Sequence, residues 1–168
     1  TSRDAQGNPF SNLSVLGIKS EIHLISMDVE DFRSVWVTIK KAKPDEIYVL
    51  SGQSSVGLSF EQLVETIQSF TIGVLNVLEA VKMMNYAIKV YHAGSSEAFG
   101  DTLGIAANES TPFQPRSPYA LAKASATWLV SNYREAYQLF ACTGILFNHE
   151  SPLRPQRFVT QKIIQTAK

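Results

Sequence analysis

Short apolar runs alternate along this chain with longer stretches in which apolar residues recur every three or four positions. The short runs predict buried β-strands, and the helical period predicts amphipathic helices between them. The predicted strands cover residues 22–29, 47–50, 90–93 and 141–147. The predicted helices cover residues 32–43, 61–84, 119–137 and 158–167. This alternation predicts an α/β fold, a parallel sheet with helices on both faces.

Small polar loops follow three of the predicted strands. They cover residues 51–55, 94–97 and 148–154. In open parallel sheets, ligands bind in the crevice beyond the carboxyl ends of the strands. We therefore expect these three loops to face one crevice.

Tyr119 and Lys123 lie four positions apart on a predicted helix, so both side chains point from the same helix face. An ammonium beside a phenol favours the phenolate, so we expect Lys123 to lower the pKa of Tyr119 and make it a base for an alcohol proton. Ser95 offers a hydroxyl for the same substrate oxygen, and Glu97 adds an acid that can move a second proton. This set predicts oxidation of an alcohol with a nicotinamide cofactor and dehydration of a sugar. A surface Tyr–Lys pair and a solvated loop acid are the alternatives.

The composition is that of one ordinary globular domain. The chain has 168 residues, 45% of them hydrophobic, and 15 basic residues balance 15 acidic ones. This balance gives no reason to expect nucleic acid or a membrane as a partner, and no apolar run approaches the ~20 residues that span a bilayer. The single cysteine, Cys142, lies in an apolar run, which predicts a buried structural thiol and a reducing, cytoplasmic compartment. No metal site is expected.

Several motifs resemble those of the extended short-chain dehydrogenase/reductase superfamily. They are GSSEAFG at 94–100 and TPFQPRSPYALAK at 111–123. Within that superfamily, the GILFNHESP run at 144–152 resembles the GDP-mannose 4,6-dehydratase family most specifically. YREAY at 133–137, PDEIY at 44–48 and GQSSV at 52–56 agree with it. The similarity extends over nearly the whole chain, and it implies a Rossmann-like sheet.

The resemblance implies conversion of GDP-mannose to GDP-4-keto-6-deoxymannose with catalytic NADP. Tyr119 would take the proton of the sugar 4-hydroxyl while hydride leaves C4 for the cofactor. The 4-ketone acidifies the C5 hydrogen, so Glu97 could remove it and then protonate the departing 6-hydroxyl. The cofactor would return its hydride to C6. A nucleotide-sugar epimerase or reductase of the same superfamily is the first alternative, and it needs no acid at Glu97.

The resemblance also implies positions for the cofactor and the nucleotide sugar. Arg3 would hold the 2′-phosphate of NADP, and a free surface arginine is the alternative. Asp28 and Val29 would flank the adenine. Further cofactor contacts are expected at Leu50, Ser51, Gly52, Gln53, Ser54, Lys123, His149 and Arg154. Contacts with the GDP-sugar are expected at Ser96, Asn148 and Lys162.

A dinucleotide-binding fold is expected to open with a strand and a glycine-rich turn at a helix start. No G-x-x-G-x-x-G motif occurs in these 168 residues. We therefore expect an internal piece of a larger protein that lacks the first βα unit and most of the C-terminal substrate domain. Residues 1–155 would be a partial NADP-binding domain, and 156–168 the start of the substrate-binding region. The parent is expected to be a homo-oligomer, a dimer or tetramer; an inactive fragment or binding module is the second alternative.

The usual strand order of such folds is 3-2-1-4-5-6. If Thr1 ends strand two, residues 22–29 are strand three and residues 47–50 are strand four. We therefore expect 47–50 to pair with 90–93, and 90–93 with 141–147. Residues 22–29 would stand apart from that sheet, or else the isolated protein would be unstable and bind NADP poorly.

Overall fold

The computed structural model describes residues 1–167, and its centre is a parallel sheet. The strands β1 (Glu46–Val49), β2 (Lys89–Ser95) and β3 (Ala141–Leu146) lie side by side in that order. Ile47 pairs with Val90, and Val90 pairs with Ala141. The predicted order of these strands is confirmed, and their carboxyl ends meet at one edge of the sheet. Lys168, the last residue of the expected substrate-binding region, lies outside the described residues.

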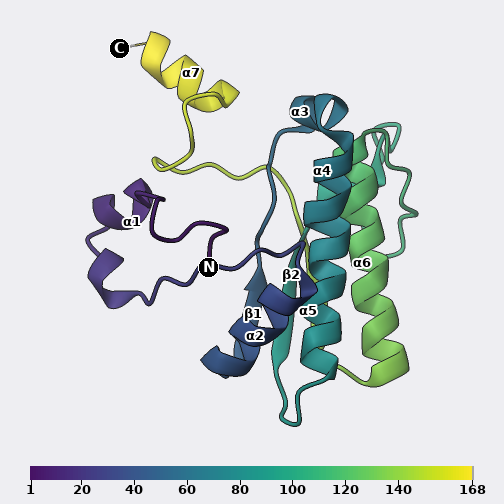
Figure 1. Cartoon of the computed structure of the whole chain (residues 1–168). Helices are drawn as coiled ribbons and strands as arrows, with labels where there is room; N and C mark the ends of the chain where they lie inside the picture. Colours follow the sequence, from purple (N-terminus) through teal and green to yellow (C-terminus); the bar gives the residue numbers. More distant parts are fainter. Residues whose placement is uncertain (168) are drawn as a thin grey trace.

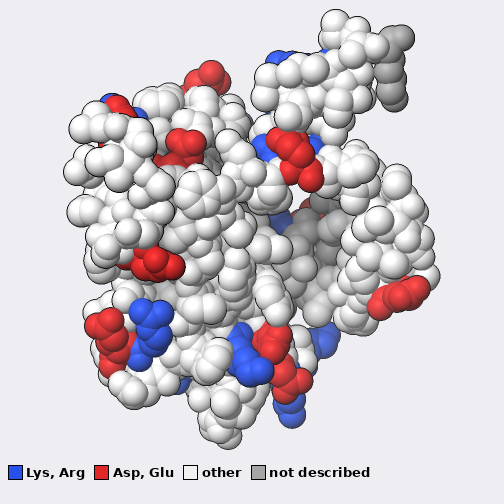
Figure 2. Space-filling model, turned by 180° about the vertical axis from the view of Figure 1, so that it is seen from behind, with Lys and Arg blue, Asp and Glu red and all other residues white. Residues whose placement is uncertain are grey.

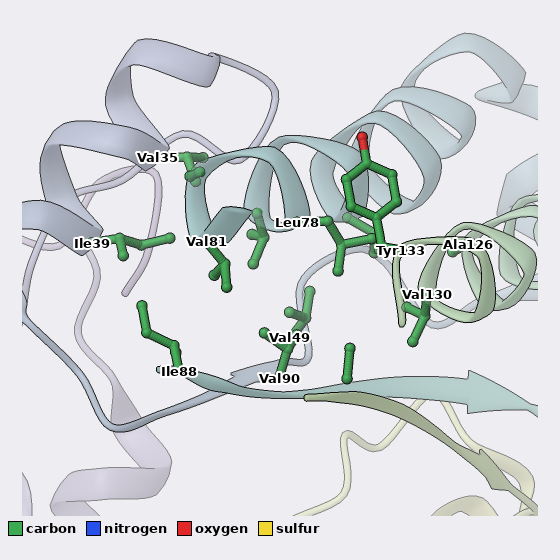
Figure 3. Close-up of a cluster of buried hydrophobic side chains, with 14 residues drawn as sticks. Val35, Ile39, Val49, Leu78, Val81, Ile88, Val90, Ala126, Val130 and Tyr133 are labelled. Carbon is green, nitrogen blue, oxygen red and sulfur yellow. The ribbon is translucent and has the colours of Figure 1, made fainter. Parts of the chain in front are cut away.

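Large helices lie side by side on one face of this sheet (Figure 1): α2 (Phe32–Ala42), α5 (Gly73–Lys82) and α6 (Pro118–Tyr137). Their apolar sides meet the strands in a continuous core (Figure 3). Val35 of α2, Leu78 of α5 and Val130 of α6 are almost completely buried there. Each such side chain stabilises the fold by roughly 1.5–3 kcal/mol relative to an exposed one. This core fixes the start of α6 relative to the sheet.

The opposite face of the sheet carries no helix in the described part of the chain (Figure 1). Tyr48 on this face is 63% exposed, and its ring centroid lies 5.8 Å from that of Tyr91. Cys142 is exposed because it alternates along β3 with the buried Ala141 and so points away from the helices. The predicted parallel sheet with helices is confirmed, but two details are corrected: in residues 1–167 the helices cover one face rather than both, and Cys142 is not a buried thiol.

Residues 22–29 do not form the predicted strand. Their pairing is limited to one parallel bridge between Ser2 and Ser26. Its hydrogen bonds run from the Ser2 amide to the Ile25 carbonyl (3.2 Å) and from the Met27 amide to the Ser2 carbonyl (2.8 Å). A strand needs a neighbour along its whole length, and one bridge does not supply it. The segment stands apart from the three-stranded sheet, as the strand order led us to expect.

The helix predicted over residues 61–84 is interrupted. A short helix, α3 (Val56–Glu61), comes before most of this range, which is itself divided into α4 (Leu63–Ile67), a π turn (Gln68–Ile72) and α5. Gln62 leaves the helical conformation, with φ −124° and ψ 55°. Further along, the hydroxyls of Thr66 and Ser69 donate hydrogen bonds to backbone carbonyls of the preceding turn. Such bonds bend helices, and here they lie immediately before the π turn, at Thr66, and within it, at Ser69.

The remaining helices lie away from the sheet (Figure 1). α1 (Ser11–Val15) and a 3₁₀ turn (Lys19–Glu21) were not predicted, whereas α7 (Val159–Thr166) confirms the predicted helix over 158–167. Neither α1 nor α7 buries a residue. Within residues 1–167, none of the helices combines the length and apolar character needed to cross a bilayer.

A polar network joins α5 to α6. The Tyr133 hydroxyl donates a hydrogen bond to the Glu79 carboxylate, and Lys82 Nζ lies 2.6 Å from the same carboxylate. Hydrogen bonds from Lys82 and Tyr133 hold the pKa of Glu79 below its usual value. Because its pKa is depressed on folding, the Glu79 charge stabilises the fold above its unfolded pKa of about 4.3. That contribution is lost as the pH falls through the lower, folded pKa.

Tyr133→Phe is therefore expected to reduce the free energy of unfolding by roughly 1–2 kcal/mol at neutral pH, because the Glu79 carboxylate loses a donor. The difference from the parent should shrink below about pH 4, where Glu79 becomes protonated. Urea unfolding at neutral and acidic pH measures both values. Tyr137→Phe is the matched control, since Tyr137 is 49% exposed. A difference that does not change with pH would contradict the assignment.

Candidate active site

Ser95 is the last residue of β2 and marks the centre of the site. Its side chain is buried, and its Oγ accepts a hydrogen bond from the Glu97 amide at 3.3 Å. This contact caps a short 3₁₀ helix (Ser96–Phe99), which the sequence did not predict. The turn leaves Ser96 half-buried and Glu97 exposed at the edge where the strands end. The hydroxyl and the acid therefore project from adjacent positions of one rigid turn.

Tyr119 lies in the first turn of α6. Ser117 caps the helix by accepting from the Ala120 amide at 3.0 Å, and Pro118 occupies the first helical position, where no donor is needed. The Tyr119 amide donates to Ser59 Oγ of α3 at 3.1 Å. Ser59 is fully buried, so this bond ties the start of α6 to α3. The tyrosine is thus held by its own helix cap and by a neighbouring helix.

The environment of Tyr119 opposes its ionisation. Burial raises the pKa of the phenol, the Ser95 hydroxyl lowers it by hydrogen bonding, and the nearby Glu97 charge raises it. The net direction is upward. These interactions place Ser95 and Glu97 beside Tyr119, so the structure brings three of the predicted catalytic residues together.

Lys123 is 6% exposed, and its Nζ donates to the Ala93 carbonyl of β2 at 2.7 Å. Burial lowers the pKa of this ammonium to about 8. Its Nζ lies 5.9 Å from the centroid of the Tyr119 ring. The expectation that Lys123 lowers the pKa of Tyr119 is wrong in this structure, because burial dominates and the ammonium is directed at a backbone carbonyl.

A cavity of about 420 Å³ lies between the N-terminal segment and the loop after β1. This volume is in the range of small-molecule sites. A hollow between these two parts is visible from behind (Figure 2). Expected cofactor residues from both segments line the cavity: Arg3, Asp28, Val29, Ser51, Gly52 and Gln53. The structure therefore brings six of them together, although they are up to 50 positions apart in sequence.

Two polar side-chain atoms in the loop after β1 could bind a ligand. Ser51 Oγ and Gln53 Nε2 are buried without a hydrogen-bond partner among the described residues. Gly52 between them has φ +105°, a conformation that other residues rarely adopt. Leu50 is 66% exposed and lines the adjacent cavity, and Ser54 is exposed outside both. Buried polar atoms need partners, so this loop fits a ligand rich in hydroxyl or phosphate oxygens.

Arg3 is not a free surface arginine. Its guanidinium lies 2.7 Å from the Glu30 carboxylate and 3.5 Å from that of Asp28. The Arg3 side chain is nevertheless 60% exposed at the cavity. An anionic group that binds Arg3 would therefore compete with Glu30.

The expected contacts after β3 are not brought to this cavity. Asn148, His149 and Lys162 are exposed. Arg154 is half-buried, donates to the His149 carbonyl and lies 3.3 Å from the Glu150 carboxylate. These contacts are local because the segment after β3 is a loop that buries none of its residues. Among residues 1–167, no three His, Cys, Asp or Glu side chains gather as metal ligands would.

Two residues of the site escaped the sequence analysis: Ser59 and Phe70. The ring of Phe70 lies 5.3 Å from the Tyr119 ring, edge to face, and 4.2 Å from Lys123 Nζ. Phe70 lies in a stretch whose periodicity predicts an ordinary helix, Ser59 lies just before that stretch, and no local signal marks either residue. His92 of β2 is buried near Lys123, and burial lowers the pKa of its imidazole to about 4, so it is neutral there.

Comparison with known proteins identifies the family of this chain. Residues 3–168 match the family model described as GDP-mannose 4,6 dehydratase. GDP-mannose 4,6 dehydratase 1 of Arabidopsis thaliana is 51% identical over 140 residues, which are 81% of this chain and 38% of that relative. The chain thus spans less than half the length of this curated relative.

Solved structures share the fold at lower identity. A dTDP-glucose 4,6-dehydratase from Streptomyces venezuelae, solved with NAD and TYD, has a TM-score of 0.83 at 19% identity, over 94% of this chain and 48% of that one. RMD from Pseudomonas aeruginosa, solved with NADPH, has a TM-score of 0.75 at 22% identity, over 89% of this chain and 55% of that one. These likenesses identify a Rossmann-like fold. The match of the family model over residues 3–168 shows that this chain belongs to the GDP-mannose 4,6-dehydratase family, and the Arabidopsis sequence agrees with it.

Proposed function

We propose that a protein carrying this chain is an NADP-dependent GDP-mannose 4,6-dehydratase, a hydro-lyase that forms GDP-4-keto-6-deoxymannose. The observation that carries the proposal is the meeting of Ser95, Glu97 and Tyr119 where β2 ends and α6 begins. A hydroxyl, a phenol and a carboxylate at one point can move the protons of both an oxidation and a dehydration. Membership of the family supports the substrate.

Each of these side chains has a separate task in the proposed reaction. Ser95 holds the sugar 4-oxygen, and Tyr119 accepts its proton. Glu97 then removes the C5 proton and delivers it to the departing 6-hydroxyl, which leaves as water. When hydride returns to C6, C5 regains a proton from the protonated Tyr119. Bound NADP⁺ would supply the redox chemistry, accepting hydride from C4 and returning it to C6. The exposure of Glu97 suits an acid that must reach substrate.

For the cofactor, the lining of the 420 Å³ cavity supports the adenosine end. We assign the 2′-phosphate to Arg3, the adenine to Asp28 and Val29, and the ribose and pyrophosphate to Leu50, Ser51, Gly52, Gln53 and Ser54. Lys123, His149 and Arg154 complete the proposed cofactor set, and Ser96, Asn148 and Lys162 face the GDP-sugar. The loop after β3, residues 148–154, would have to move for His149 and Arg154 to reach the cofactor. The Pseudomonas structure was solved with NADPH and the Streptomyces one with NAD, so a nicotinamide cofactor is the ligand type that the two share.

The organisation of the protein follows from this assignment. Residues 1–155 would hold the cofactor and the catalytic groups, and 156–168 would begin the region that binds substrate. We also propose a cytoplasmic homo-oligomer. Large apolar side chains exposed on the outer helices support self-association: Val64 of α4 is 67% exposed and Trp128 of α6 is 65% exposed.

The direct test is incubation of the full-length protein that carries this chain with GDP-mannose and NADP⁺. A 4-keto-6-deoxy sugar should form with no net NADPH, since the hydride taken from C4 returns to C6. Mass spectrometry of the product and the NADPH absorbance measure the two quantities. Accumulation of NADPH would identify a simple dehydrogenase, and a C4 epimer with no loss of water would identify an epimerase.

Glu97→Gln keeps the size of the side chain and removes its acid. Loss of water is expected to fall by at least ~10²-fold, the lower range for a positioned acid or base. Oxidation at C4 should survive in part, measured as hydride transfer in a single turnover. Glu109→Gln, which changes another exposed loop acid, is the control and should leave the rate unchanged. Unchanged dehydration in Glu97→Gln would show that Glu97 is only a solvated loop acid.

Ser95→Ala should move the pH profile of the reaction upward. The Ser95 hydroxyl lowers the pKa of Tyr119, so its removal leaves the opposing effect of burial uncompensated. The base form of Tyr119 would then appear only at higher pH, and the rising limb of rate against pH should shift with it. Ser110→Ala, at an exposed loop serine with no role in the proposed site, is the control. A lower rate with an unshifted limb would limit Ser95 to holding substrate.

A further inference from the structure

Phe70 lies in the π turn (Gln68–Ile72) between α4 and α5 and is 3% exposed. A π turn inserts one extra residue, which rotates the following side chains by about 100° relative to a continuous α-helix. Such turns cost regular hydrogen bonding and occur frequently at functional sites. Here the turn places an aromatic ring against the start of α6, where Tyr119 and Lys123 lie.

The Lys123 ammonium lies over the face of this ring, with Nζ 4.2 Å from the centroid. An ammonium so positioned is attracted by the negative face of the aromatic ring. Among the described residues, no carboxylate is within ion-pair distance of Lys123. A buried charge without such a partner is costly. The Ala93 carbonyl and the Phe70 ring are therefore the groups that offset it.

The other titratable groups around Lys123 do not stabilise its charge. His92 of β2 faces it and is neutral, because burial and the Lys123 charge lower the pKa of the imidazole to about 4. Tyr119 of its own helix is held in the phenol form by burial. The ring of Phe70 is thus the main side-chain partner of this ammonium.

Phe70 also contacts two other parts of the site. Its ring meets that of Tyr119 at 89°, with centroids 5.3 Å apart, an arrangement that aromatic pairs prefer. On another side it fills the space beside Gly52, where an added Cβ would overlap the ring. One side chain consequently touches the loop assigned to the cofactor, the tyrosine and the lysine.

We propose that Phe70 is a positioning residue whose ring holds the Lys123 ammonium beside Tyr119 and links this pair to the loop at Gly52. The chemical purpose of this arrangement rests on the proposed function, because it assumes that Lys123 and Tyr119 serve the reaction. The physical contact does not depend on it. A movement of the Gly52 loop on cofactor binding would reach Lys123 through the Phe70 ring.

The test replaces Phe70 with trifluorophenylalanine, which keeps the shape of the ring and weakens its negative face. Without that attraction, the ammonium should be easier to deprotonate. The pKa of Lys123 is expected to fall by at least about half a unit, a threefold change in its proton dissociation constant. NMR titration of isotope-labelled lysine measures it in the protein without cofactor or substrate. The Lys123 resonance is identified by its loss in Lys123→Arg.

The same replacement at Phe99 is the matched control. Phe99 is 7% exposed, and its ring packs on Phe113 at 5.3 Å; no lysine lies over it in residues 1–167. The pKa of Lys123 should not change there. An unchanged or raised Lys123 pKa in the Phe70 variant would overturn the proposal. Because the titration needs no catalysis, that result would leave the enzymatic tests of the proposed function intact.

Discussion

The hydrogen bond from Lys123 Nζ to the Ala93 carbonyl is the contact on which the geometry of the site depends. It joins the second turn of α6 to β2 two residues before Ser95, so the helix start cannot slide along the strand. The bond is buried and charge-assisted, which makes it stronger than a neutral hydrogen bond. Tyr119, one helical turn before Lys123, is thereby held beside Ser95. The core beneath α5 and α6 supports the same alignment from the other side.

Burial holds Tyr119 and Lys123 in place and also makes their charged forms unfavourable. The environment that fixes Tyr119 and Lys123 disfavours the charged form of each, so the phenol resists deprotonation while the ammonium loses its proton more readily. The structure compensates with polar and aromatic partners rather than with ions: the Ser95 hydroxyl, the Ala93 carbonyl and the Phe70 ring. A base in such a site depends on its hydrogen-bond donors more than on a neighbouring charge.

The cofactor side of the site is organised by different forces. The cavity between the N-terminal segment and the loop after β1 has Ser51 and Gln53 in its wall, each with a buried polar atom that lacks a partner among the described residues. Arg3, also in the wall, is already paired with Glu30 and Asp28. A bound phosphate would replace one anionic partner of Arg3 with another. The binding free energy gained from this contact would therefore be smaller than that of a contact with an unpaired arginine. The cofactor cavity and the catalytic residues meet at Gly52, which packs on Phe70.

The amino-acid sequence alone determined the alternation of strands and helices, the order of β1, β2 and β3, and the pairing of Tyr119 with Lys123 on one helix face. These features depend on periodicity and on spacing within one element, which neighbouring residues encode. Tertiary structure decided what depends on distant partners. Residues 22–29 are not a strand because only one bridge pairs them, and the long helix turns at Phe70 to meet α6. Tertiary structure also decided the direction of the Tyr119 pKa shift. The spacing of Tyr119 and Lys123 suggested that the ammonium would lower this pKa, whereas burial by residues far along the chain raises it.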